Sequence, residues 1–296
     1  MKHQYIGVDI GGSHMTAAIV NLFSGTIEQA SLQRIQVEPH ASANEILELW
    51  ATTIYKVVPL ENLSNCQIGI AMPGPFDYEN GICWMKNVNK YDHLYGLDIR
   101  QELAKRLDIS PSQISFRNDA EAFLAGEMVF GAGRGFSKGL GITLGTGLGT
   151  SLFEKGNAYD LALGINHPLH DGVAEDYIST RWFIKRYTQL TQDTIAGVKE
   201  LAGAYKANPA ARQTFDEFAQ NLSVVMEQFV ALYQPDVIVF GGNIAQSSEL
   251  FFPVIDARLM GQVSLRQSAL NEYAALMGSV SHGVLQTTHF QNVETP

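Results

Sequence analysis

The sequence predicts an α/β protein whose two halves are built alike. A glycine-rich hairpin leads each half, first around Asp9–Ser13 and again around Gly145–Gly149. Short β-branched strands alternate with helical patterns along the whole chain. The length of 296 residues, with 46% hydrophobic residues, is sufficient for a large core in one or two domains.

Charge and composition exclude several classes of protein. The formal net charge of −10 argues against a general nucleic-acid surface, so a phosphate site must be made locally from backbone amides and a few cations. No apolar stretch near 18 residues is uninterrupted, and the N-terminus has no basic-then-apolar signal segment. We therefore expect a cytoplasmic protein without a membrane partner. Cys66 and Cys83 lack any Cys-x-x-Cys spacing and are expected to be reduced and structural.

The first hairpin lies in the stretch IGVDIGGSHMTAAIV, residues 6–20. Apolar residues alternate before the glycines and a β-branched apolar run follows them, which predicts two strands joined by a turn. In an ordinary turn, Gly11 and Gly12 would only supply positive φ. Alternatively, their bare N–H groups and that of Ser13 admit an anion, while Asp9 binds a metal or a water beside it. One motif leaves both interpretations open.

The first half continues with two capped helices and two strands. Each helix has Ser or Asp at the N-cap and Glu or Gln three residues later, a pattern that starts helices. The expected elements are a helix from about 43 to 57 capped by Ser42, a strand Gln67–Met72 ending at a Pro-Gly-Pro turn around Gly74, a helix Ile99–Leu107 capped by Asp98, and a strand that runs into a helix at Asp119.

The second half repeats this punctuation. Its hairpin, ITLGTGLGTSLF, is followed by a helical stretch from about Ala174, a long amphipathic segment and a strand Asp236–Phe240. Two such hairpins can grip one polyphosphate group from both sides, and neither matches a Walker loop or a dinucleotide fingerprint. The glycine pair Gly241-Gly242 after the last strand allows close approach of adenosine, or is a simple strand-to-helix turn.

Five motifs, in this order, resemble those of the ROK (repressor, ORF, kinase) sugar kinases: GVDIGGSH, AMPGPF, FRNDAEAFLAGE, TLGTGLGTSLFEKG and DVIVFGGN. The resemblance covers about residues 5–283. It implies an actin-like, hexokinase-like α/β fold, which duplicates a ribonuclease H-like unit in two domains with a central cleft. We expect the domains to be 1–117 and 118–279, with a helix at about 280–296 that packs back on the first. We also expect a homodimer.

The resemblance assigns roles to individual residues. Asp119 of the Asn-Asp motif would take the proton of the attacking sugar hydroxyl, although an isolated Asn-Asp is also a helix cap. Asn118 and Gly74 would bind sugar hydroxyls, and Asn87 is a looser match to the asparagine of the loop that closes on the sugar. The residues expected at the phosphates and nucleotide are Asp9 (indirectly, through magnesium), Gly11, Gly12, Ser13, Gly145, Thr146, Gly147, Gly241 and Gly242.

One stretch, LGINHPLHDGVAEDYIST, departs from the family pattern. Most ROK proteins carry Glu-x-Gly-His followed by a cysteine-rich zinc loop, whereas here Gly164 occupies the glutamate position and no cysteine follows. His167 matches the motif histidine and would bind a sugar hydroxyl or be structural. Glu175 matches the later sugar-binding glutamate. Without thiolates we expect no zinc.

The predicted function is phosphoryl transfer from ATP with Mg²⁺ to a hexose, with glucose giving glucose 6-phosphate. The zinc-less stretch also resembles polyphosphate glucokinases, so inorganic polyphosphate is an alternative donor. Arg134, Lys138 and Lys155 near the second hairpin could follow a longer phosphate chain, or be solvated surface.

Other classes share the family or the fold. ROK repressors carry a DNA-binding domain before the first phosphate loop, and only Met1–Tyr5 precede that loop here, so we expect no nucleic-acid partner. A noncatalytic sugar-sensing ROK protein and an actin-like ATPase are further alternatives. The joint presence of Asn118, Asp119 and Glu175 argues against both.

Overall fold

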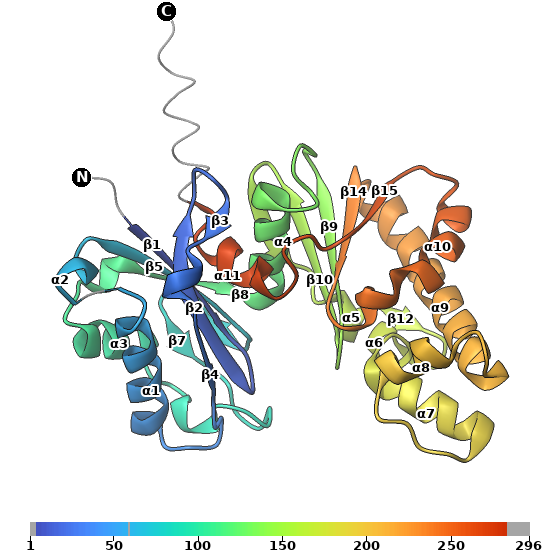
Figure 1. Ribbon diagram of the computed structural model, residues 1–296, viewed down its shortest axis with the longest axis horizontal. Coiled ribbons are helices and arrows are strands. Elements are labelled where there is room, and N and C mark those ends of the chain that lie inside the picture. The colour runs from blue at the N-terminus through green and yellow to red at the C-terminus, as the bar shows by residue number, and fades with distance from the viewer. Residues whose placement is uncertain (1–3, 59, 283–296) are drawn as a thin grey trace, which may run out of the picture. The chain divides into compact units, whose positions relative to one another are not determined.

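Two compact units make up the part of the chain that the computed structural model describes, residues 4–58 and 60–282 (Figure 1). The first unit contains the described residues up to 130 together with those from 272 onward. The second unit contains residues 131–271. The chain therefore leaves the first unit once and returns to it near its end.

The first unit is built on a sheet of order β3-β2-β1-β5-β8, with β4 also paired to β2. β1 runs antiparallel to β2 and parallel to β5, and β5 runs parallel to β8. The strands are β1 (Gln4–Ile10), β2 (His14–Asn21), β3 (Thr26–Ile27), β4 (Gln33–Gln36), β5 (Cys66–Met72) and β8 (Ile114–Asn118), with a small sheet of β6 (Phe76–Asp77) and β7 (Ile82–Cys83). The helices are α1 (Ala43–Tyr55), α2 (Leu60–Leu63), α3 (Ile99–Leu107), α4 (Asp119–Phe130) and α11 (Ala274–Ser279).

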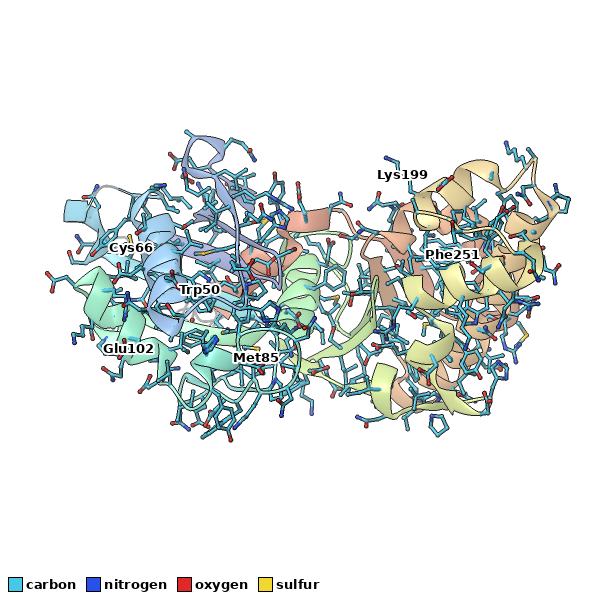
Figure 2. The ribbon with its side chains drawn as sticks, turned by 90° about the horizontal axis from the view of Figure 1, so that it is seen from below. Trp50, Cys66, Met85, Glu102, Lys199 and Phe251 are labelled. Carbon is cyan, nitrogen blue, oxygen red and sulfur yellow. The ribbon has the colours of Figure 1, made fainter. Side chains whose placement is uncertain are left out.

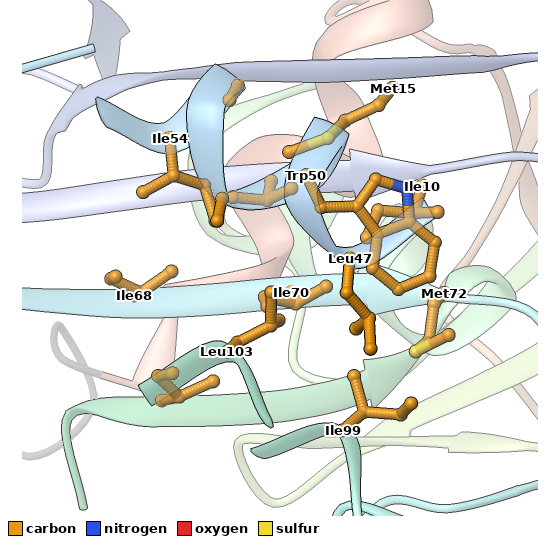
Figure 3. Packing of buried hydrophobic residues seen from close by; sticks show 14 of the residues in the cluster. Ile10, Met15, Leu47, Trp50, Ile54, Ile68, Ile70, Met72, Ile99 and Leu103 are labelled. Atoms are coloured by element: carbon orange, nitrogen blue, oxygen red, sulfur yellow. The ribbon is translucent and has the colours of Figure 1, made fainter. Parts of the chain in front are cut away.

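One face of this sheet carries the apolar core of the first unit. Ile10 from β1 and Ile70 from β5 lie in one buried cluster with Trp50 and Leu47 of α1 and Leu103 of α3 (Figure 3). The two predicted caps hold the covering helices in place. The Ser42 and Glu45 side chains form a complete capping box on α1, and Asp98 accepts a hydrogen bond from the Gln101 N–H at the start of α3.

The opposite face is lined by small residues. Gly7 and Gly69 are register partners on β1 and β5, and a Cβ on either would overlap a backbone carbonyl oxygen of α11. A Cβ on Gly278 of α11 would likewise overlap the Ala122 carbonyl oxygen of α4. Helix α11 therefore packs on the sheet and on α4 at backbone contact, which only glycine allows.

The boundary between the units differs from the predicted one. Helix α4 belongs to the first unit, so the first segment of that unit ends at Phe130 and not at residue 117. The segment from Glu272 onward, which includes α11, also belongs to it. Helix α4 joins the first unit because it packs against α11. The residues in this contact are about 150 positions apart, so no local sequence pattern predicts it. Most of the predicted helix at about 280–296 lies outside the described residues.

The second unit repeats the strand arrangement of the first. Its sheet has the order β11-β10-β9-β14-β15, with β9 antiparallel to β10 and parallel to β14, and β14 parallel to β15. The strands are β9 (Gly139–Leu144), β10 (Leu148–Glu154), β11 (Asn157–Asp160), β14 (Val237–Gly241) and β15 (Ser264–Gln267), with a small hairpin of β12 (Pro168–Leu169) and β13 (Gly172–Val173). The helices are α5 (Leu163–Asn166), α6 (Ala174–Tyr177), α7 (Thr180–Thr191), α8 (Val198–Ala204), α9 (Pro209–Tyr233) and α10 (Phe252–Leu259).

An aromatic core stabilises the second unit. Phe218 of α9 packs against Phe183 of α7 in a tilted arrangement and edge-on against Phe251, and all three rings are buried. Figure 2 labels Phe251 in this core and Trp50 in the first unit. Within the described residues, no helix carries an apolar stretch long enough to cross a lipid bilayer. The predicted strand–helix alternation and the duplicated halves are both confirmed.

Candidate active site

The parallel strands β1, β5 and β8 end at the same edge of the first sheet, and predicted site residues lie at each end. Asp9 is near the end of β1, Gly74 follows β5, and Asn118 and Asp119 form the junction of β8 with α4. The first glycine turn joins β1 to β2 at this edge. Such an edge, where parallel strands end together, is the usual position of ligand sites in α/β sheets.

Two carboxylates face different surroundings at this edge. Asp9 is half-buried, and burial together with the charge of Asp119 raises its pKa to about 7, while the charge of Arg34 acts in the opposite direction. Asp119 is exposed at the first position of α4. The site thus combines one carboxylate that is difficult to ionise without a cation and one that is open to solvent.

The Asn118 side chain caps the start of α4. Its side-chain oxygen accepts hydrogen bonds from the N–H groups of Ala120 at 2.8 Å and Glu121 at 3.3 Å. The amide nitrogen of Asn118 donates to the hydroxyl of Tyr78 at 3.2 Å. Asp119 Oδ1 also accepts the Ala120 N–H at 2.8 Å, while the Asp119 residue remains exposed to solvent.

Tyr78 connects Asn118 with the Pro-Gly-Pro turn. Its hydroxyl donates to the Met72 carbonyl oxygen at 3.1 Å, and a Cβ on Gly74 would lie 3.3 Å from that hydroxyl. The turn and Asn118 are therefore neighbours, as a shared sugar site requires. Sequence reasoning missed Tyr78, because a tyrosine in a loop has no pattern that names its partner.

Asn87 lies on an exposed loop in the left-handed region, with φ of 59°, and its N–H donates to Asp92 at 3.1 Å. This loop reaches the first glycine turn through two other side chains. The Lys90 side chain lies against Gly12, and the hydroxyl of Tyr91 donates to the Gly11 carbonyl oxygen at 2.5 Å. Tyr91 was also missed by sequence reasoning.

The second glycine turn joins β9 to β10 in the second unit. The Gly145 N–H donates to the Gly147 carbonyl oxygen at 3.1 Å, while Thr146 is exposed at the tip. Gly242 has φ of 86°, and a Cβ there would overlap the carbonyl oxygen of Leu144, immediately before the turn. The structure thus brings Gly241-Gly242 and the second turn together at the common end of β9 and β14.

Glu175 is bonded to this same turn. One of its carboxylate oxygens accepts the Leu148 N–H at 3.0 Å, and the other pairs with Arg181 at 2.7 Å. A Cβ on Gly147 would overlap the Glu175 carboxylate. Thr180 donates both its N–H, at 2.8 Å, and its hydroxyl, at 2.9 Å, to the Gly145 carbonyl oxygen. The segment that carries the predicted sugar glutamate therefore also fixes the second glycine turn.

Gly164 is glycine because its backbone touches another backbone. It is buried in α5, and a Cβ there would overlap the carbonyl oxygen of Leu148. A side chain as large as the glutamate usual at this family position has no room in this arrangement. The missing carboxylate is thus tied to the close packing of α5 on β10.

The histidines of the departing stretch are bonded to amide side chains of α9. His167 Nε2 lies 2.5 Å from Gln228 Oε1, and His170 Nε2 lies 2.9 Å from Asn221 Oδ1. A sugar hydroxyl would have to bind His167 at Nδ1 or displace Gln228. Zinc does not fit this donor set. No cysteine is available, and among the described residues no group of three or more His, Cys, Asp and Glu side chains is placed to hold a metal.

The basic residues near the second turn are partly engaged. Lys138 pairs with Glu154 at 2.8 Å, and its N–H donates to Asp236 at 2.9 Å. Lys155 stands in a tight turn between β10 and β11, with φ of 53°. The ion pair of Lys138 with Glu154 is one that an ordinary surface residue makes.

Comparison with known proteins places the chain in a family. The model of the ROK family matches residues 5–165 and 170–279. The glucokinase of Thermotoga maritima is 28% identical, over 95% of this chain and 97% of that protein. The N-acetylgalactosamine kinase AgaK of a Shewanella species is also 28% identical, over 93% of this chain and 94% of that protein.

A solved structure confirms the predicted fold. The crystal structure of a ROK family glucokinase from Streptomyces griseus, in complex with glucose and AMPPNP, is 21% identical, with a TM-score of 0.73 over 94% of this chain and 98% of that one. The duplicated strand order of the two units is thus that of the actin-like, hexokinase-like fold. Since the family model covers most of the sequence, the chain belongs to the ROK family.

Proposed function

We propose that this protein is a sugar kinase that transfers the terminal phosphoryl group of ATP to a hexose hydroxyl, with glucose as the first candidate and glucose 6-phosphate as its product. The observation that carries the proposal is the pair formed by Asp9 and Asp119 at one sheet edge. Phosphoryl transfer needs a base at the incoming hydroxyl and neutralisation of the phosphate oxygens. The two carboxylates, one exposed and one half-buried, suit these two tasks.

Asp119 is the proposed base. As the sugar oxygen bonds to the terminal phosphorus, its proton moves to the Asp119 carboxylate. The bond from that phosphorus to the bridging oxygen of the β-phosphate breaks, and ADP leaves. Asn118, the turn at Gly74 and the loop at Asn87 would hold the other sugar hydroxyls. Glu175 and His167 are further candidate sugar ligands.

Asp9 fits a hard cation. Its carboxylate offers oxygen ligands, and burial together with the charge of Asp119 raises its pKa, so a bound cation would favour its ionised form. Magnesium, when bound, would neutralise the donor phosphate oxygens. The N–H groups of Gly12 and Ser13 would contact the phosphates, and the second turn with Gly241-Gly242 would hold the nucleotide.

The names of the relatives agree on the class of reaction, sugar phosphorylation, but differ in the sugar. One relative is named a glucokinase and the other an N-acetylgalactosamine kinase, and the two are equally identical to this chain. The sugar substrate is therefore what the experiment has to determine. AMPPNP in the Streptomyces griseus glucokinase supports ATP as the donor. The short stretch at 167–172 favours polyphosphate as a second candidate donor, whereas the pairing of Lys138 with Glu154 counts against a long basic track.

The test is a panel of sugars against donors. Purified protein is incubated with Mg²⁺ and each of glucose, mannose, N-acetylglucosamine and N-acetylgalactosamine, with either ATP or polyphosphate, and sugar phosphate is quantified by mass spectrometry. We expect glucose with ATP to give the highest kcat/KM. A folded protein that binds sugar but forms no sugar phosphate would be a sensor, and the kinase proposal would be wrong. Sedimentation equilibrium of the same preparation tests the proposed homodimer.

A further inference from the structure

Tyr91 is a buried residue whose backbone lies in the left-handed region and whose hydroxyl donates a hydrogen bond to a backbone carbonyl. Its side chain is 0% exposed, its φ is 58°, and its ring packs edge-on against Trp50 with centroids 5.4 Å apart. Its N–H donates to the Pro39 carbonyl oxygen at 2.9 Å. These contacts fix both the backbone and the ring, so the phenol hydroxyl points in one direction.

That hydroxyl donates to the carbonyl oxygen of Gly11 at 2.5 Å, inside the first glycine turn. Burial raises the Tyr91 pKa, and the charge of nearby Asp9 raises it further, so the phenol remains a donor at any ordinary pH. The Gly11 N–H is used within the turn, since it donates to the His14 carbonyl oxygen at 2.9 Å. Both polar groups of Gly11 are therefore fixed by the protein.

The fixed carbonyl determines where the next amide points. The Gly11–Gly12 peptide is trans, and in a trans peptide the C=O and the following N–H point in opposite directions. By holding the Gly11 carbonyl, Tyr91 turns the Gly12 N–H away from itself. Gly12 is exposed, and no acceptor for its N–H is assigned among the described residues.

We propose that Tyr91 is the positioning residue that pre-orients the Gly12 amide as a donor to the phosphate chain of the nucleotide. This inference rests on the proposed kinase function and adds a residue to it. Because glycines are flexible, the peptide would otherwise rotate and lose orientation before phosphate binds. Tyr91 also belongs to the loop that carries Asn87. The loop proposed to contact the sugar therefore also holds the first glycine turn in place.

A single-atom change tests this inference. Tyr91→Phe keeps the ring against Trp50 and removes only the hydroxyl. We expect kcat/KM for ATP to fall roughly tenfold to a hundredfold, as misplacement of a phosphate-binding group does. The affinity for AMPPNP, measured by calorimetry, should fall with it, while the KM for sugar changes less than about twofold because no sugar contact is lost.

Tyr55→Phe is the matched control. The Tyr55 hydroxyl also donates to a backbone carbonyl, that of Arg106 at 2.7 Å, but it links α1 to α3 away from the glycine turns. Both variants lose one tyrosine–carbonyl bond, and only Tyr91→Phe should lose nucleotide affinity. Equal nucleotide affinities in the two variants, or a parallel loss for sugar and nucleotide in Tyr91→Phe, would contradict the inference. If the wild-type protein phosphorylates no sugar, the proposed function fails instead, and the AMPPNP comparison still decides the role of Tyr91.

Discussion

The Asp9 carboxylate is half-buried near that of Asp119, so its ionisation is unfavourable in the folded chain. The folded-state pKa of about 7 exceeds the ordinary value of 3.8, so between these values the native protein keeps a proton that the unfolded chain has lost. Stability contributed by protonated Asp9 is therefore present at low pH and is lost as pH rises toward 7. Thermal melts with EDTA from pH 5 to 8 should show wild-type Tm falling relative to Asp9→Asn. A Tm difference that is constant across this range would contradict the raised pKa of Asp9.

The same variant tests the role of Asp9 in turnover. A neutral amide is a poorer ligand for a hard cation, so Asp9→Asn should keep sugar binding, lose most of kcat and need more magnesium for half-maximal rate. The measurement is a magnesium titration of initial rates beside a melt of the same preparation. Wild-type turnover with wild-type magnesium dependence would reduce Asp9 to a turn residue.

The sequence alone identifies some residues of the candidate site and gives no signal for others. Asp9, Asn118 and Asp119 stand in short motifs whose neighbours are adjacent in the chain, so the local sequence is sufficient to identify them. Tyr78 and Tyr91 bond to Asn118 and to the Gly11 turn, which are 40 and 80 residues away. Isolated tyrosines carry no signal for such distant partners.

Among the elements, α5 is fixed by the contact of Gly164 with the backbone of Leu148. Gly164→Ala should destabilise the protein by about 1–3 kcal/mol, because a methyl group would force the helix away from β10. Gly203→Ala is the matched control, since a Cβ on Gly203 in α8 meets open space and should stabilise by about 0.5–1 kcal/mol. Urea unfolding of both variants gives the two values. A Gly164→Ala protein as stable as the wild type would contradict the close packing.

Elements with strong local signals were predicted well. The capped helices α1 and α3 and the hairpins at both glycine turns are confirmed, because capping residues and alternation act over a few positions. Helix α11 has six residues and packs through glycine contacts, so neither length nor an apolar stripe could reveal it.

For the whole molecule, the paired hairpins predicted the duplication, and the structure confirms it as two sheets with the same strand order. The boundary at residue 130 differs from the predicted one because it depends on which distant segment α4 packs against. The proposed reaction requires sugar and nucleotide to be bound at the same time. The rise in Tm with glucose and AMPPNP together should therefore exceed the sum of their separate effects, measured at fixed ligand concentrations. Additive shifts would argue against coupled substrate binding.

The most direct measurement of the kinase proposal compares the wild type with Asp119→Asn. Both proteins are assayed for sugar phosphate formed from ATP and for sugar binding by calorimetry, using the best substrate of the panel. We expect the wild type to turn over, and Asp119→Asn to bind sugar within roughly tenfold of wild type while kcat falls by about 10² to 10⁴. Asp119→Asn turning over at the wild-type rate would contradict the assignment of the base, and a wild type that binds sugar without phosphorylating it would contradict the kinase itself.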